Sequence, residues 1–168
     1  AGFGKSQVKL LKRFPNVMIT RTLSKAYGLA GLRFGYMLGV KEVISQIAAT
    51  LIPWNVGTIP MWAALAALDD EPFLQETQKV VRDGLAFLFE GLAEMQLRTL
   101  PTQTNFFLIE VGHDAQKVYE AMLRRGVIVR AMNAYGLDNY IRISVGRPEE
   151  NQRFLNALKE VMNELKED

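Results

Sequence analysis

Residues 22–25, Thr-Leu-Ser-Lys, bring two hydroxyls and one amine into a stretch of four residues, and Arg33 follows eight residues later. Side chains two positions apart on an extended chain lie on the same face, so the hydroxyls of Thr22 and Ser24 can point the same way. Hydroxyls donate neutral hydrogen bonds to a phosphate oxygen, and a guanidinium adds charge-assisted, forked ones. The amine of Lys25 can condense with a carbonyl compound to form a Schiff base. The spacing therefore predicts a place where a phosphate and an aldehyde are held together.

Three segments of the sequence resemble one family of enzymes. Residues 21–36, RTLSKAYGLAGLRFGY, are similar to the lysine segment of fold-type I aminotransferases, which depend on pyridoxal 5′-phosphate, and within these to histidinol-phosphate aminotransferase. Residues 124–130 (RRGVIVR) and 140–146 (YIRISVG) match the same family in the same order. One such motif alone is weak grounds for a match, but three in order and at matching spacing are strong. The resemblance runs from about Phe14 to the C-terminus.

The resemblance implies a role for each matching residue of the first segment. Lys25 would be the catalytic residue, because it would hold pyridoxal phosphate as a Schiff base and then move a proton between the substrate Cα and the cofactor. Thr22, Ser24 and Arg33 would bind the phosphate of the cofactor. The alternative for Lys25 is a solvated surface lysine. For the remaining three, the alternatives are hydroxyls that cap a helix and an arginine that pairs with a surface carboxylate.

The later segments supply candidate substrate-binding residues. Arg142 lies on the polar side of an apolar strand, where an unpaired guanidinium would be costly, so we expect an anionic partner. The resemblance implies that this partner is the carboxylate of the substrate, with a structural salt bridge as the alternative. By the same resemblance Arg130 would contact the phosphate of the substrate, although related enzymes with different substrates vary at such positions. Asn105 either lines the substrate cleft or satisfies backbone groups in a turn.

The activity that the resemblance implies for the full-length enzyme is transamination in histidine biosynthesis. Its reactants would be L-histidinol phosphate, a phosphorylated amino alcohol, and 2-oxoglutarate, a 2-oxo acid. Alternatives within the same fold are an aromatic or other amino-acid aminotransferase and threonine-phosphate decarboxylase. An alternative of another class is a non-catalytic domain that acts in packing or dimerisation. Family members are generally dimers, so we expect a homodimer, and the lack of cysteine is compatible with a cytoplasmic location.

The expected fold is α/β, namely the C-terminal portion of PLP-transferase fold type I. Residues 1–70 would be a remnant of the large cofactor-binding domain, and residues 71–168 would form a small α+β domain entered through a long helix. Family members carry a long region ahead of the lysine, and its cofactor-binding residues cannot be assigned here. We therefore expect this chain to be a fragment of a longer enzyme that is inactive alone, with a short natural protein as the alternative.

The composition is that of a globular protein, with 49% hydrophobic and 23% charged residues. The net charge is +2 and no run of five or six like charges occurs, so we expect no nucleic-acid partner. No apolar run has the length of a membrane span, so we expect no membrane partner. The chain has no cysteine and one histidine, His113, so we expect no metal site.

Hydrophobic periodicity predicts the elements that must position these residues. A buried strand over residues 17–22 would place Lys25 just past its carboxyl end, where open α/β sheets bind ligands. The further elements expected in the first part are the end of an amphipathic helix at 5–12, a strand at 32–38, a helix at 41–51 and a buried, alanine-rich helix at 58–68. The second part would contain a long helix at 71–97, strands at 105–111, 127–130 and 140–145, a helix from Asp114 to Gly126 and a last helix from Pro148.

Overall fold

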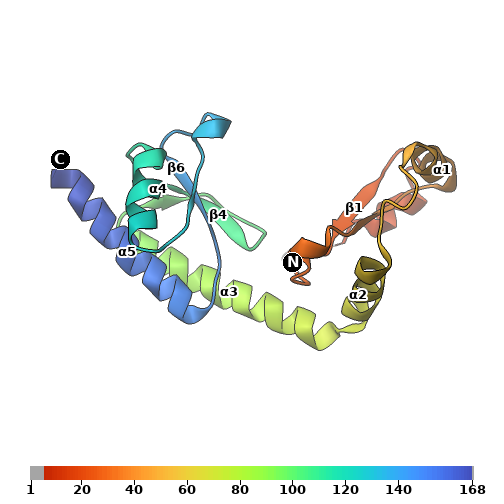
Figure 1. Cartoon of the computed structure of the whole chain (residues 1–168), viewed down its shortest axis with the longest axis horizontal. Helices are drawn as coiled ribbons and strands as arrows, with labels where there is room; N and C mark the ends of the chain where they lie inside the picture. Colours follow the sequence, from red (N-terminus) through yellow and green to blue (C-terminus); the bar gives the residue numbers. More distant parts are fainter. Residues whose placement is uncertain (1–5, 168) are drawn as a thin grey trace. The chain divides into compact units, whose positions relative to one another are not determined.

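A computed structural model describes residues 6–167 and divides the chain into two compact units. The first unit ends at Gln78 and the second begins at Lys79. This boundary lies within the long helix α3 (Glu71–Glu94), which therefore belongs to both units (Figure 1). None of the helices in the described part of the chain combines the length and the apolar character needed to cross a membrane.

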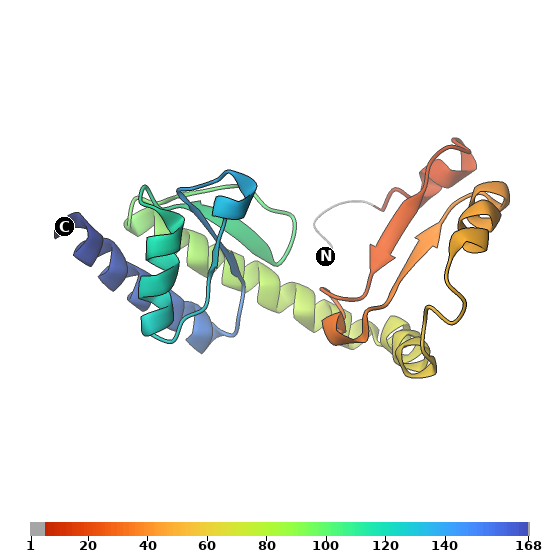
Figure 2. The ribbon, with the colours of Figure 1, turned by 45° about the horizontal axis from the view of Figure 1, so that its top comes forward.

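The first unit contains a two-stranded antiparallel sheet (Figure 2). Strand β1 (Ile19–Thr22) pairs with β2 (Gly35–Leu38), and the register joins Thr22 to Gly35. The strands approach closely at Gly35, where a Cβ atom would lie only 2.7 Å from the carbonyl oxygen of Arg21. Glycine is therefore required at this position to keep the register.

The predictions for these two strands need correction. The strand expected at residues 17–22 is shorter and mostly exposed rather than buried, because β2 is its only partner in residues 6–167 and the pairing is antiparallel. The strand expected at 32–38 begins only at Gly35, because a short 3₁₀ helix, η2 (Ala30–Leu32), and the left-handed Arg33 occupy the residues before it.

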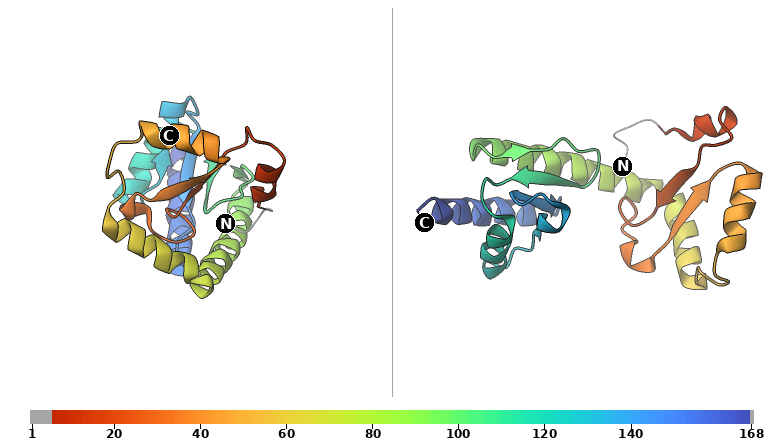
Figure 3. Two further views of the ribbon diagram at one scale, coloured as in Figure 1. Left: turned by 90° about the vertical axis from the view of Figure 1, so that its right-hand side faces the viewer. Right: turned by 90° about the horizontal axis from the view of Figure 1, so that it is seen from above.

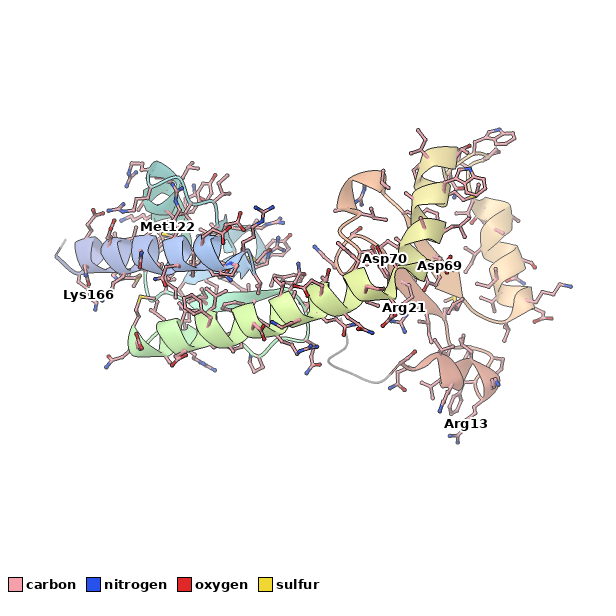
Figure 4. The ribbon with its side chains drawn as sticks, turned by 90° about the horizontal axis from the view of Figure 1, so that it is seen from below. Arg13, Arg21, Asp69, Asp70, Met122 and Lys166 are labelled. Atoms are coloured by element: carbon pink, nitrogen blue, oxygen red, sulfur yellow. The ribbon has the colours of Figure 1, made fainter. Side chains whose placement is uncertain are left out.

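The helices of the first unit follow the predicted positions but not always the predicted type or burial. Helix α1 spans Lys41–Thr50 and α2 spans Thr58–Asp69. The amphipathic helix expected at 5–12 is instead a 3₁₀ helix, η1 (Val8–Lys12), in its described part; Figure 4 labels Arg13 at its end. Residue 5 lies outside the described residues.

The first unit buries few apolar side chains. Among its described residues, only Leu23 and Ala64 are buried apolar residues. Helix α2, expected to be buried, exposes Ile59 and Trp62 at 76% and 65% of their surface. A protein surface seldom carries so many large apolar side chains in one small unit unless another surface packs on it.

The second unit contains a four-stranded antiparallel sheet in the order β3-β4-β6-β5. The strands are β3 (Arg98–Thr99), β4 (Phe106–Glu110), β6 (Tyr140–Ser144) and β5 (Arg130–Ala131). Burial alternates strictly along β4 and β6, which is the pattern of a sheet with one face packed and one face open.

Helix α4 (Ala115–Arg124) packs against β5, β6 and helix α5 (Pro148–Glu167), and the second half of α3 contacts β4. Phe89 of α3 meets Phe107 of β4 edge to face, with ring centroids 4.8 Å apart. Helices α3 and α5 lie side by side in both Figure 1 and Figure 3. Most of the buried apolar side chains of residues 6–167, including Leu88, Ile109, Ile141 and Leu158, belong to this unit.

Capping residues explain where the helices of the second unit begin and end. Asp114 caps α4 as expected, because its carboxylate accepts hydrogen bonds from the backbone N–H groups of Gln116 and Lys117 at 2.8 and 3.3 Å. The strand expected at 127–130 begins only at Arg130, since the N–H of Val127 donates to the carbonyl of Met122 at 3.0 Å and so completes the end of α4.

Both ends of α3 also have local causes. Asp70 caps its start by accepting a hydrogen bond from the N–H of Phe73 at 3.0 Å, and Figure 4 labels Asp69 and Asp70 where α2 meets α3. The helix ends at Glu94, before the expected Leu97, because Gln96 adopts a left-handed conformation with φ of 58°. The N–H of Leu97 then folds back to the carbonyl of Leu92 at 3.0 Å.

Candidate active site

The loop between β1 and β2 carries the four residues predicted to hold the cofactor. Its anchor is Leu23, whose side chain is fully buried. The N–H of Leu23 donates to the carbonyl of Phe34 at 3.4 Å, and its carbonyl accepts from the N–H of Leu29 at 3.1 Å. The first of these bonds extends the strand pairing by one step. The next residue on each strand, Ser24 and Arg33, therefore begins and ends the loop.

The two hydroxyls of this loop lie together. The Oγ1 of Thr22 donates a hydrogen bond to the Oγ of Ser24 at 2.9 Å, and the backbone N–H of Ser24 donates to the same Oγ1 at 3.1 Å. This agrees with the alternation seen in the sequence. Because the Ser24 hydroxyl accepts in this pair, its own proton remains available to an anion.

Arg33 is held in an uncommon backbone conformation. Its φ of 52° lies in the left-handed region, which costs a residue with a Cβ atom about 1–2 kcal/mol. The Nη1 of its guanidinium donates to the carbonyl of Ala30 at 2.8 Å. Within residues 6–166 the guanidinium of Arg33 makes no ion pair, so the alternative of a surface salt bridge finds no support there.

Lys25 lies in the turn that follows β1. The turn is closed by a hydrogen bond from the N–H of Gly28 to the carbonyl of Lys25 at 3.0 Å. The side chain of Lys25 is exposed, and it follows the two hydroxyl residues just past the end of the strand. One short loop thus carries an amine, two adjacent hydroxyls and a guanidinium, which are the groups needed to hold an aldehyde that also bears a phosphate.

The two candidate substrate arginines are direct partners in the second unit. The register of β5 and β6 pairs Arg130 with Arg142, so both side chains project from the same face of the sheet. This is the face opposite the helices, since the neighbouring residues Ile141 and Ile143 point into the core. The two arginines thus lie on neighbouring strands.

Each of these guanidiniums stacks on an aromatic ring. The Cζ of Arg142 lies 5.1 Å from the centre of the Phe106 ring, and the Cζ of Arg130 lies 5.3 Å from the centre of the Tyr135 ring. The Nη2 of Arg130 also donates a hydrogen bond to the Tyr135 hydroxyl at 2.9 Å. Neither arginine forms an ion pair with a carboxylate of the described chain. The structural salt bridge considered for Arg142 is therefore not observed there.

A carboxylate on the same face of the sheet is engaged elsewhere. Glu110 accepts hydrogen bonds from Arg98 at 3.4 Å and from the side-chain amide of Asn139 at 3.1 Å. The hydroxyl of Tyr140 also donates to it, and this hydrogen bond, together with partial burial and the charge of Glu110, raises the pKa of Tyr140. Glu110 is thus surrounded by three donors, and Arg142 stacks on Phe106 instead.

A cavity of 570 Å³ adjoins the two arginines. The charged residues along its wall are three arginines, Arg130, Arg142 and Arg153, and one glutamate, Glu150. The excess of positive charge favours an anionic ligand. Apolar and small residues complete the wall, among them Val127, Ile128, Ile143, Ser144, Gly146 and Phe154.

Asn105 joins the ends of two strands. Its carbonyl accepts a hydrogen bond from the N–H of Val145 at 2.9 Å, and its side-chain Oδ1 accepts from the hydroxyl of Thr104 at 3.3 Å. The residue is half-buried. Both hydrogen bonds belong to a turn. A contact between Asn105 and substrate stays a prediction.

One family model covers most of this chain. The model of the class I and II aminotransferases matches residues 1–158. The chain belongs to this aminotransferase family. Histidinol-phosphate aminotransferase 2 of Pseudomonas aeruginosa is 43% identical over 152 residues, which are 90% of this chain and 41% of that protein. The chain therefore spans about two fifths of the length of this curated relative.

Two solved structures resemble the aminotransferase chain. Histidinol-phosphate aminotransferase from Sinorhizobium meliloti, in complex with pyridoxal-5′-phosphate, superposes with a TM-score of 0.82 and 32% identity, over 90% of this chain and 42% of that one. L-threonine-O-3-phosphate decarboxylase from Porphyromonas gingivalis superposes with a TM-score of 0.79 and 29% identity, over 91% and 49% of the two chains. The predicted family and the predicted fold, a C-terminal portion of fold type I, are confirmed.

Sequence reasoning missed the aromatic residues beside the arginines of this aminotransferase. Tyr135 follows Arg130 by five residues, and a turn returns it to that side chain. Phe106 begins β4, and the register places it opposite Ser144, two residues beyond Arg142. The sequence alone does not show that these aromatic residues lie beside the arginines, because both contacts depend on the strand register or on a turn.

Proposed function

We propose that the protein to which this chain belongs is a pyridoxal phosphate-dependent aminotransferase that moves an amino group between L-histidinol phosphate and 2-oxoglutarate. The observation that carries this proposal is the direct pairing of Arg130 with Arg142 on one face of a sheet, without a carboxylate partner in residues 6–166. Two such cations favour anionic reactants. Family membership and the loop around Lys25 support the assignment of the reaction.

The lysine loop fits the cofactor. The adjacent hydroxyls of Thr22 and Ser24, together with the guanidinium of Arg33, can satisfy a phosphate group. When bound, pyridoxal phosphate supplies an aldehyde for attachment to an amine and an electron-poor ring that stabilises negative charge at the substrate Cα. Lys25 holds the cofactor and moves the proton at the substrate Cα, first as a base and then as an acid.

The two arginines divide the anionic groups of the reactants between them. Histidinol phosphate is an amino alcohol phosphate without a carboxylate, whereas 2-oxoglutarate carries carboxylates and no phosphate. Arg130 binds the phosphate of the amino donor and Arg142 binds a carboxylate of the oxo acid. The forked guanidinium suits both groups because it offers two parallel N–H donors. Asn105 lines the cleft beside them.

The test of the reaction uses the full polypeptide that the gene encodes. The purified protein is incubated with pyridoxal phosphate, reduced with borohydride and digested, and the modified peptide is identified by mass spectrometry. We expect a pyridoxyl group on Lys25 and 2-oxoglutarate-dependent turnover of histidinol phosphate, both lost in Lys25→Ala. Lys41→Ala, which changes an exposed lysine at the start of α1, is the matched control. Cofactor attached elsewhere, or not at all, contradicts the proposal.

A second candidate reaction is decarboxylation of a phosphorylated amino acid. The similarity to a threonine-phosphate decarboxylase structure favours it over an aromatic aminotransferase, because such a substrate carries both a phosphate and a carboxylate. Release of carbon dioxide from O-phosphothreonine, without formation of glutamate from 2-oxoglutarate, would identify this reaction. Faster turnover of phenylalanine than of histidinol phosphate would identify an aromatic aminotransferase. Lack of turnover and of cofactor binding in the full polypeptide would favour a non-catalytic role in packing.

We also propose that the protein is a homodimer with a cytoplasmic location. Its two domains would meet between residues 70 and 71. The exposed apolar side chains of Trp54, Met61 and Trp62, at 96%, 45% and 65% exposure, support a contact surface between protomers. Size-exclusion chromatography with light scattering tests the dimer, and Trp62→Glu is expected to shift the mass toward that of one protomer. An unchanged dimer mass would place the contact elsewhere.

A further inference from the structure

We propose that Tyr135 is a specificity-determining residue that selects the phosphorylated donor: it aligns the fork of Arg130 and presents its own hydroxyl proton to the same phosphate. This inference rests on the proposed function and assigns part of its substrate selectivity to a residue outside the three motifs.

The geometry around Tyr135 supports both parts of this role. Its hydroxyl accepts a hydrogen bond from the Nη2 of Arg130 at 2.9 Å, while the guanidinium carbon lies 5.3 Å from the centre of the ring. A phenol that accepts a hydrogen bond still has its own proton to donate. Hydrogen bonds in a chain polarise one another, so the neighbouring cation makes this hydroxyl a better donor. The side chain is 59% exposed, so an anion can reach it.

The fold holds Tyr135 in place independently of Arg130. The residue ends the 3₁₀ helix η3 (Asn133–Tyr135), and its N–H donates to the carbonyl of Met132 at 2.9 Å. Met132 is 8% exposed, and its own N–H donates to the carbonyl of Tyr140 on β6 at 3.1 Å. The turn that carries the ring is thus attached to the strand that carries Arg142.

The two arginines differ in what accompanies them. Arg142 stacks on Phe106, which has no polar atom to offer a ligand. Arg130 stacks on Tyr135, which adds one neutral donor to the forked guanidinium. A phosphate has three terminal oxygens and a carboxylate has two, so a phosphate can use a donor beyond the fork. The hydroxyl of Tyr135 therefore favours phosphate at Arg130, and the bare ring of Phe106 leaves a two-donor fork at Arg142.

The test compares Tyr135→Phe, which keeps the stacked ring and removes the hydroxyl, with Tyr119→Phe, which removes a hydroxyl from helix α4 on the packed side of the sheet. In the full polypeptide we expect Tyr135→Phe to raise the KM for histidinol phosphate about tenfold, as the loss of one hydrogen bond to a charged group predicts. The KM for 2-oxoglutarate should not change. Tyr135→Leu, which also removes the stacked ring, should raise the KM for histidinol phosphate further.

A direct titration separates failure of this inference from failure of the proposed function. Binding of inorganic phosphate to each variant is measured by calorimetry with pyridoxal phosphate present throughout, so that the phosphate site of the Lys25 loop is already occupied, and this measurement needs no turnover. Weaker phosphate binding by Tyr135→Phe and unchanged binding by Tyr119→Phe would support the inference even in a protein that does not transaminate histidinol phosphate. Equal phosphate affinity of wild type and Tyr135→Phe, a lack of phosphate binding by the wild type, or an equal rise of both KM values would overturn it.

Discussion

Arg130 and Arg142 are Cα partners across β5 and β6, so two cations project from the same face of the sheet at the same level. Like charges directly opposite one another destabilise a strand pair by about 0.2–1 kcal/mol. Stacking on Tyr135 and Phe106 orients the two guanidiniums but does not neutralise them. The two positive charges therefore repel each other, and an anion bound beside them would reduce this repulsion.

Removal of one of these charges should stabilise the fold and weaken anion binding. We expect Arg130→Gln to raise the free energy of unfolding by up to about 1 kcal/mol, because the repulsion with Arg142 is lost. Inorganic phosphate should raise the melting temperature of the wild type more than that of the variant, since only a ligand that binds the folded state stabilises it. Thermal denaturation with and without phosphate measures both effects. Arg98→Gln, which removes a cation paired with Glu110, is the control and should not stabilise. A lower melting temperature for Arg130→Gln would contradict this expectation.

Two glycines of α3 should respond differently to substitution by alanine. A Cβ atom at Gly84 would lie 2.4 Å from the Cγ1 of Val145, and one at Gly91 would lie 2.5 Å from the Cδ1 of Leu155. Both substitutions gain about 1 kcal/mol of helix propensity. Valine is branched at Cβ and stiff, whereas the tip of leucine can rotate away. We therefore expect Gly84→Ala to cost about 1–3 kcal/mol more than Gly91→Ala in urea denaturation. Equal stabilities would show that Val145, just past β6, moves aside as easily as Leu155 does.

Stability should fall at alkaline pH through Tyr140. Its hydrogen bond to the carboxylate of Glu110 raises the pKa of Tyr140 above the ordinary value of 10.0, so the folded state favours the protonated phenol. The stabilisation is complete below about pH 10 and is lost as the pH rises through the folded-state pKa, because the ionised phenol would face Glu110. Denaturation of wild type and Tyr140→Phe across this range measures the effect. The variant should lose less stability above pH 10 than the wild type, and parallel curves would rule the mechanism out.

Local pattern predicted much of the fold and of the candidate site. Periodicity located the α-helices, the cap at Asp114 and the strands β4 and β6, because each depends on residues close in sequence, whereas β3 was not predicted. Alternation also predicted that the hydroxyls of Thr22 and Ser24 would lie together. The start of β5 at Arg130 was misplaced because the end of α4 uses the N–H of Val127.

Features that depend on distant contacts could not be derived in the same way. Apolar patterning predicted a buried α2, but burial requires a partner surface that the pattern does not contain. The stacking of Arg130 on Tyr135 and of Arg142 on Phe106 depends on strand register and on a turn. The three donors to Glu110 are not grouped by any recognisable spacing in the sequence, so sequence patterns could not predict them.

The buried apolar side chains are unevenly distributed between the two units. Leu23 and Ala64 lie in the first unit, and the great majority follow Lys79. Arg130 and Arg142 belong to the unit with a core of its own, while Lys25 belongs to the unit that has almost none among its described residues. Under the proposed function, mutations around Tyr135 can therefore alter the choice of amino donor without changing any residue of the Lys25 loop. Selection could then change the substrate that the protein accepts and leave the cofactor loop as it is.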